Sequence, residues 1–173
     1  MRYMAVARMV DHWDDIGAWL CLGEAPCTNK NYYWYASTES DQVWFIPWDM
    51  DHTLEPASRN RPRNNNVPEW DDVDAGCELV EFRTGRYYRP PACDTLIGGM
   101  ATGSRELYVA YSNELLNGPF SVESMNARID ALETLLMPYI LEDPYEDVDA
   151  WQEALTELRS TVVAKREFVQ RRL

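Results

Sequence analysis

The chain has 173 residues, enough for one domain, or a large part of one, with a sizeable core. Its net charge of −13 argues against binding to nucleic acid or anionic membranes, which needs a basic face, and its 46% hydrophobic content argues against general disorder. No apolar run approaches the roughly 20 residues that a membrane-spanning helix needs.

The N-terminal segment predicts an amphipathic helix over about residues 2–13, because apolar residues such as Met4, Val6 and Met9 form an approximate stripe. Asp11 interrupts the segment too soon for a signal peptide, so we expect the chain to begin inside a larger protein. Residues 14–30, with their glycines, proline and acids, predict a loop.

The next segment predicts a β-hairpin. Residues 31–35 are aromatic-rich, 37–41 have turn chemistry, 43–46 form a second apolar run, and a proline ends it. Asp49 and Asp51 follow that run, and Asn31 begins the opposite strand. Because magnesium takes oxygen ligands, often one or two carboxylates plus substrate phosphates, the end of this hairpin is a candidate cation site. We expect the hairpin tryptophans to be buried in preference to stacking on an adenine.

The remaining chain predicts an irregular segment over about residues 57–92, followed by helices over 93–173. Ser121 suits a helix N-cap, with Phe120 and Met125 placed as a hydrophobic staple. Two helical stripes, which we expect to be core, then occupy positions 122, 125, 129, 132, 136 and 139, and positions 151, 155, 158, 162 and 169.

The four cysteines form two local pairs, Cys21 with Cys27 and Cys77 with Cys93. Neither pair has the C-x₂-C type spacing of zinc sites, and each brackets a loop that contains glycine or proline. We therefore expect two disulfides, with free buried thiols as the alternative, and an extracytoplasmic location.

The hairpin sequence NYYWY, followed after a turn by VWFIPWDMD, resembles the CotH kinase family of spore-coat-protein-H-like secreted kinases. The resemblance continues at 107–121, 129–132 and 166–173, and it covers most of the chain outside about 57–92. The P-W-D-x-D core is its most specific part.

The resemblance implies an α+β fold, predominantly helical, like the C-terminal lobe of a protein kinase with a small antiparallel hairpin at the site. It implies one domain over 1–173, with a catalytic and metal-site segment at 1–56. The implied activity is transfer of the γ-phosphate of ATP, with Mg²⁺ or Mn²⁺, to Ser or Thr of secreted or coat proteins. No glycine-rich loop with a strand-borne lysine precedes residue 31, so we expect the N-terminal portion of the kinase to be a missing partner.

By this resemblance, Asn31 and Asp49 would be metal ligands and Asp51 an auxiliary ligand. In protein kinases the catalytic base lies five residues before the metal-binding asparagine, where this chain has Pro26, which has no proton acceptor.

Asp14 is the preferred base, because the sequence His-Trp-Asp-Asp at 12–15 resembles an N-W-D-G element that family members often carry. The Cys21–Cys27 segment would then be an excursion between base and asparagine. Glu24 is the rival, since it precedes Asn29 by five residues.

Two interpretations from other classes stay open. Residues 49–53 fit the D-x-D-x-T motif of haloacid-dehalogenase-like phosphatases, in which Asp49 would be the nucleophile and Asp51 the general acid/base. That fold needs more parallel strands, a suitably placed lysine and a further acidic pair, whereas the later chain predicts helices. The other interpretation is a non-catalytic, kinase-like binding or structural module.

Overall fold

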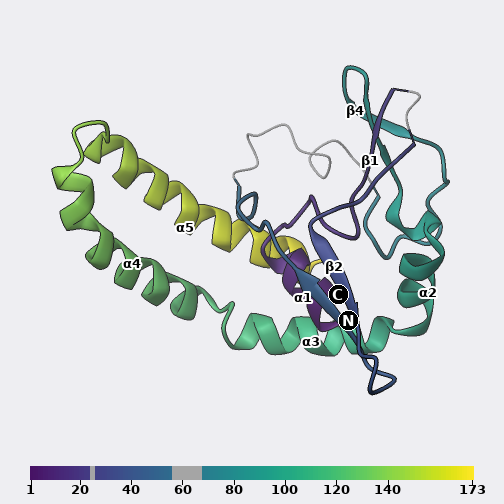
Figure 1. The fold of residues 1–173 in the computed structure, drawn as a ribbon. Coiled ribbons are helices and arrows are strands. Elements are labelled where there is room, and N and C mark those ends of the chain that lie inside the picture. Colours follow the sequence, from purple (N-terminus) through teal and green to yellow (C-terminus); the bar gives the residue numbers. More distant parts are fainter. Residues whose placement is uncertain (24–25, 56–67) are drawn as a thin grey trace. The chain divides into compact units, whose positions relative to one another are not determined.

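The computed structural model describes residues 1–23, 26–55 and 68–173 (Figure 1). It divides into two compact units. The first contains the described parts of 12–53 and 68–107, and the second contains 2–11, 54–55 and 108–173. The fold consists of helices and small antiparallel sheets, which confirms the predicted α+β class.

The hairpin of the first unit is confirmed. β2 (Tyr32–Ala36) pairs with β3 (Val43–Pro47) in antiparallel register, from Tyr32 opposite Pro47 to Ala36 opposite Val43. The turn forms as its sequence predicts, because the Ser37 hydroxyl oxygen accepts hydrogen bonds from two backbone N–H groups that follow it.

The first unit also contains a three-stranded antiparallel sheet that the sequence did not predict. Its order is β1-β5-β4, made of β1 (Trp19–Leu22), β5 (Arg86–Arg89) and β4 (Val80–Arg83). The predicted loop at 14–30 therefore contains a strand, and the predicted irregular segment at 57–92 contains two; its residues 57–67 lie outside the described part. Ala18 and Tyr88 are buried in this sheet's core, and the Tyr88 hydroxyl donates to the Gly17 carbonyl at 2.7 Å.

After this sheet come the short 3₁₀ helix η2 (Pro91–Cys93) and α2 (Thr95–Gly103). The Asp94 carboxylate caps α2 by accepting from the N–H groups of Leu96 and Ile97. Both predicted disulfides are present, Cys21–Cys27 and Cys77–Cys93. They are compatible with an extracytoplasmic protein.

The second unit contains α1 (Arg2–Met9), most of α3 (Arg105–Asn117), α4 (Val122–Glu142) and α5 (Val148–Gln170). Its core contains Met9, Leu116, Phe120 and Val169. α1 is shorter than predicted, because Asp11 adopts a left-handed backbone conformation (φ 56°) that ends helical geometry.

Helices from residue 95 onward confirm the predicted C-terminal pattern. The Ser121 hydroxyl caps α4 by accepting from the backbone N–H of Ser124 at 3.1 Å, and Met125 packs on the cluster that contains Phe120. Among the described residues, no helix is both long and apolar enough to cross a membrane.

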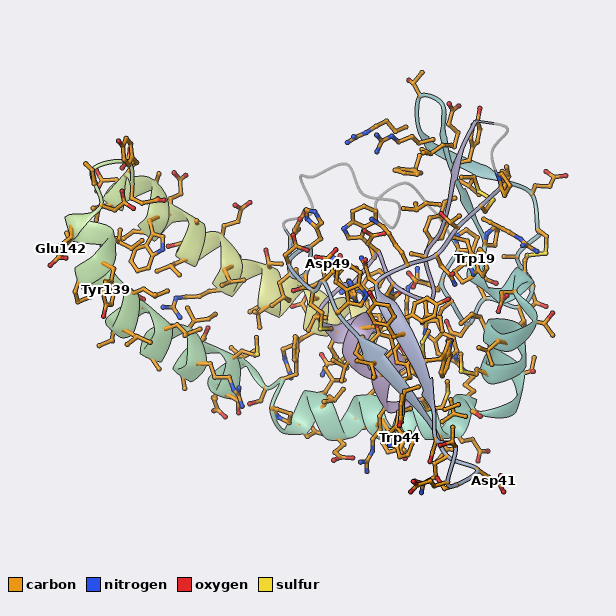
Figure 2. All side chains as sticks on the ribbon, viewed as in Figure 1. Trp19, Asp41, Trp44, Asp49, Tyr139 and Glu142 are labelled. Carbon is orange, nitrogen blue, oxygen red and sulfur yellow. A yellow bond between two sulfur atoms is a disulfide. The ribbon has the colours of Figure 1, made fainter. Side chains whose placement is uncertain are left out.

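The predicted core stripe on α4 is wrong over its second half. Ile129 is buried, whereas Leu132, Leu136 and Tyr139 are exposed, and the Tyr139 side chain can be followed in Figure 2. The stripe on α5 is half-buried at Trp151, and buried further along at 162 and 169. Helical spacing predicts which residues share a face, but not whether another element covers that face.

Candidate functional site

The hairpin of β2 and β3 brings Asn31 and Asp49 to one end of the same ribbon. The last strand pair joins Tyr32 and Pro47, and beyond it the Trp48 N–H donates to the Asn31 carbonyl at 3.0 Å. Asp49 is the next residue and is exposed (Figure 2). Asn31 and Asp49 both have left-handed backbone angles, with φ of 65° and 59°, which Asn and Asp adopt more readily than most residues.

Asn31 is also joined to Asp14, 17 residues earlier in the chain. Its side-chain Nδ2 donates to the Asp14 backbone carbonyl at 2.8 Å, in a buried position. Two residues before Asn31, Asn29 Nδ2 donates to the Ile16 carbonyl at 3.0 Å. A second side-chain amide therefore joins the segment before β2 to the loop that contains Asp14. The bond from Asn31 uses its amide nitrogen and leaves the amide oxygen to serve as a ligand.

The Asp14 carboxylate is buried but has a cation beside it. Asp14 is 5% exposed, and its Oδ2 lies 2.9 Å from Lys30 Nζ, whose side chain is 58% exposed. Its other oxygen, Oδ1, is buried and has no hydrogen-bond partner among the described residues. Buried carboxylate oxygens are normally hydrogen-bonded, so one without a partner is an exception that a functional role would explain.

Lys30 is the site residue that the sequence did not point to. Kinases hold ATP phosphates with a strand-borne lysine, whereas Lys30 lies in the loop before β2. The available signal was its position directly before Asn31, which places it in the same loop as the candidate metal ligand.

Asp51 and Glu24 are not brought into this cluster by any described contact. Asp51 lies two residues beyond Asp49, with its side chain 66% exposed and its Oδ2 3.8 Å from His52 Nε2. The His52 ring is tilted beside that of Trp13, with centroids 6.1 Å apart. Glu24 lies outside the described residues.

Two other polar residues near Asp14 are fully buried. Asp15 accepts from the Gly17 N–H at 2.8 Å through Oδ1, which is a turn contact and explains its burial locally. His12 is also inaccessible to solvent. His12, Asp14 and Asp15 are thus all buried in the same loop.

The donor chemistry at the hairpin end fits a hard cation. Within the described ranges, no three His, Cys, Asp or Glu side chains gather to form a metal site of their own. An Asn amide oxygen with one or two Asp carboxylates would suit Mg²⁺ or Mn²⁺ whose coordination is completed by water and substrate phosphate. Asn31 and Asp49 therefore have side-chain chemistry that is compatible with a hard cation, whereas no described contact brings Asp51 to them.

The hairpin tryptophans are more exposed than the sequence led us to expect. Trp34, Trp44 and Trp48 are 52%, 43% and 46% exposed. Trp48 stacks on Tyr33 with ring centroids 6.0 Å apart, so this strand face presents an open aromatic surface near Asp49.

A search of the curated proteins found no match. The family model described as CotH kinase protein matches residues 1–173, the whole chain. The same hairpin that holds Asn31 and Asp49 carries the family's resemblance in sequence, and the chain belongs to the CotH kinase family.

Proposed function

We propose that this chain forms the metal- and hydroxyl-binding part of an ATP-dependent kinase that phosphorylates Ser or Thr of secreted or coat proteins. Membership of the CotH kinase family supports a kinase-like function in general. The observation that carries the proposal is the hydrogen bond from Asn31 Nδ2 to the Asp14 carbonyl, at the end of the ribbon that bears Asp49. This bond joins the Asn31 side chain to the backbone of Asp14, 17 positions earlier in the chain, which supports a site that contains both residues.

Asp14 is proposed as the general base. Its Oδ1 has no described partner and would accept the proton of the substrate hydroxyl as the phosphoryl group is transferred. Lys30 holds Oδ2 at 2.9 Å and so restricts the carboxylate to one orientation. Because the base is already oriented, the reaction does not lose entropy in orienting the base.

Asn31 and Asp49 are proposed as the cation ligands, with Asp51 in an auxiliary role. Mg²⁺ or Mn²⁺ bound with ATP would neutralise negative charge on the phosphoryl group during transfer. The bond to Asp14 orients the Asn31 amide, and the left-handed backbone at Asp49 turns the chain where β3 ends.

We further propose that polypeptide beyond these 173 residues supplies the glycine-rich loop and strand-borne lysine that kinases place over ATP. The open aromatic face of the hairpin, with Trp44 and Trp48, is suited to be covered by such a lobe or by the nucleotide base. The two disulfides support action outside the cytoplasm.

The phosphatase interpretation finds less support. Every strand pair in the described residues is antiparallel, and β3, which leads to Asp49, pairs with β2 in a two-stranded ribbon. The D-x-D-x-T chemistry requires a larger parallel sheet to hold its nucleophile. The experiment below distinguishes a kinase from a non-catalytic module.

The test measures Mn²⁺ binding by electron paramagnetic resonance, with and without ATP, and ³²P transfer from ATP to dephosphorylated casein. The complete gene product that carries these residues is used. Asp49→Ala should weaken Mn²⁺ binding and reduce transfer by about 100-fold or more, since it removes charge stabilisation of the transferring group. Asp51→Ala should cause a smaller loss, because water can partly replace an auxiliary ligand.

Asp41→Ala is the matched control, because Asp41 is an exposed aspartate in the turn between the same two strands (Figure 2). It should leave both measurements unchanged. Transfer that survives Asp49→Ala would overturn the site. An aspartyl-phosphate trapped on Asp49 from a generic phosphomonoester would favour the phosphatase, and weak metal binding without either reaction would favour a non-catalytic module.

A further inference from the structure

The apolar stripe of α4 has the spacing of a helix that packs along another helix. Its members recur three and four residues apart, at positions 122, 125, 129, 132, 136 and 139. The first half contacts the core, where Ile129 is buried and Met125 packs on the cluster of Leu116 and Phe120. The second half continues the same pattern beyond that core.

This second half is open to solvent. Leu132, Leu136 and Tyr139 are 55%, 42% and 66% exposed, and Leu135 beside them is 60% exposed. We call these four residues the α4 stripe. Large apolar side chains scattered singly on a surface are ordinary, but four adjacent on one helical face form a patch of the kind that marks an interaction site.

The α4 stripe lies on the side of the helix away from α5. Arg159 of α5 pairs with Asp130 and Glu133 of α4, at 2.8 Å each, so these two acids lie on the α5 side. At 100° per residue, the α4 stripe lies on the opposite side from them.

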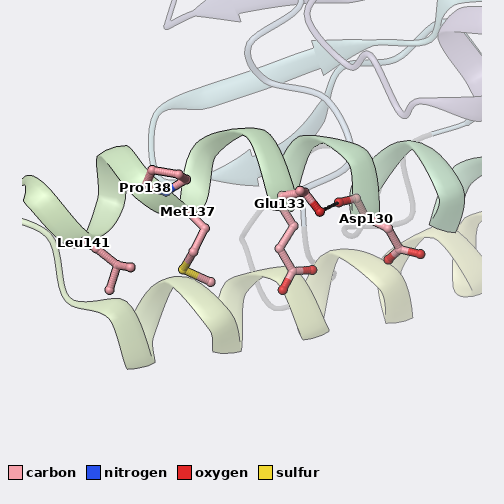
Figure 3. Close-up of a pocket in the computed structure, with 6 residues that line it drawn as sticks. Asp130, Glu133, Met137, Pro138 and Leu141 are labelled. Carbon is pink, nitrogen blue, oxygen red and sulfur yellow. Dashed lines mark hydrogen bonds between the residues drawn. The ribbon is translucent and has the colours of Figure 1, made fainter.

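A shallow pocket of about 580 Å³ occupies the α5 side and is lined by Asp130, Glu133, Thr134, Met137, Pro138 and Leu141. Figure 3 shows the labelled lining residues Glu133, Met137 and Leu141 extending from the same side of α4. The pocket and the α4 stripe are therefore separate surfaces.

The charge around the α4 stripe indicates what could cover it. Residues 129–158 contain nine acids, of which Asp130 and Glu133 lie on the α5 side and pair with Arg159. Five others lie in or beside the turn between α4 and α5: Glu142, Asp143, Glu146, Asp147 and Asp149. A second copy of this chain would bring like charges together, whereas a cationic partner would gain attraction along with apolar burial.

We propose that the α4 stripe is a docking surface for a basic amphipathic helix of a different protein. The partner's own apolar stripe would pack on Leu132, Leu135, Leu136 and Tyr139, as in helix-in-groove recognition. Its Lys or Arg residues would face the carboxylates at the α4–α5 turn. This inference is independent of the proposed phosphoryl transfer, since the α4 stripe contains none of the proposed site residues.

The test is isothermal titration of the whole chain with a synthetic helical peptide as long as α4, 21 residues. The peptide carries leucines three and four residues apart, with lysines at the other exposed positions. A twin peptide carries glutamates in place of the lysines. We expect the lysine peptide to bind, the glutamate twin not to bind, and the affinity to fall as salt rises from about 0.05 to about 0.5 M.

Leu136→Gln should weaken binding of the lysine peptide about tenfold, which is the scale of one leucine's burial. Leu141→Gln is the matched control, because Leu141 is also an exposed leucine of α4 but lines the pocket on the other side. It should leave the affinity unchanged, and circular dichroism should show both variants folded.

Several results would overturn the proposal. They are absence of binding up to about 1 mM peptide, equal binding of the glutamate twin, and equal weakening by the two leucine variants. Sedimentation that shows a dimer of this chain, dissociated by Leu136→Gln, would replace the basic partner with a second copy.

Discussion

Replacing Lys30 by Met removes the cation from a carboxylate that is itself buried. The Asp14 side chain is 6% exposed, whereas the Lys30 side chain is 58% exposed, so the pair lies between a buried and a surface ion pair. Removing one partner of a buried pair costs about 3–5 kcal/mol, and exposed pairs contribute about 0–1 kcal/mol. We therefore expect Lys30→Met to lower the free energy of unfolding by about 2 kcal/mol. For a chain of this length, that corresponds to a fall in Tm of about 4–8 °C.

The assay is urea denaturation at pH 7 without reductant, applied as a double-mutant cycle with Asp14→Asn. In the Asp14→Asn background the buried charge is gone, so Lys30→Met should cost less than about 0.5 kcal/mol. Lys30→Arg keeps a cation at this position and should retain most of the stability. Equal destabilisation by Lys30→Met in both backgrounds would refute the reasoning, because the effect would not act through Asp14.

Two further predictions concern stability. Replacing the Cys77–Cys93 bridge with serines should lower the free energy of unfolding by about 3 kcal/mol, and replacing the Cys21–Cys27 bridge should lower it by about 2 kcal/mol, because the closed loops span 16 and 6 residues. Denaturation that ranks the two variants in the reverse order would contradict this entropic argument. Gly98→Ala should lower Tm, because its Cβ would lie 2.5 Å from a backbone carbonyl oxygen, whereas Gly99→Ala, with nothing within 4 Å, should keep or raise it. Equal Tm values for the two alanine variants, measured by calorimetry, would show that the crowding at Gly98 is relieved without cost.

The sequence predicted the elements whose signals are local. The hairpin was found because aromatic runs flank a turn that Ser37 stabilises, and α4 because Ser121 is a strong N-cap. The strands β1, β4 and β5 were missed because each has only four residues, and β1 pairs with a strand far along the chain. Long-range pairing leaves little trace in either partner's own sequence.

The candidate site was proposed from the sequence for a different reason, its resemblance to a family motif, and its residue roles stay predictions. That resemblance named Asn31 and Asp49, but not the salt bridge between Asp14 and Lys30, because a contact between residues 16 positions apart depends on how the loop closes. The exposure of the second half of the apolar stripe on α4 could not be predicted either. A period of 3.6 residues is the same for a covered face and for an open one, so Leu136 could not be distinguished from Ile129.

The pairing of β1 with β5 has a consequence for the order in which the first unit folds. The β4–β5 hairpin is local, but the Tyr88 hydroxyl bonds the Gly17 carbonyl 71 residues away, so β1 must close a long loop before it joins that hairpin. The β2–β3 ribbon and the helices involve only near neighbours in sequence and can form without waiting for that closure. The loop that presents Asp14 directly precedes β1, and so it should be among the last parts to become rigid. If Asp49 and Asp14 have the roles proposed above, the ribbon that bears the metal ligand would form early and the segment that bears the base late, and any kinase activity should return on refolding only in the slowest phase.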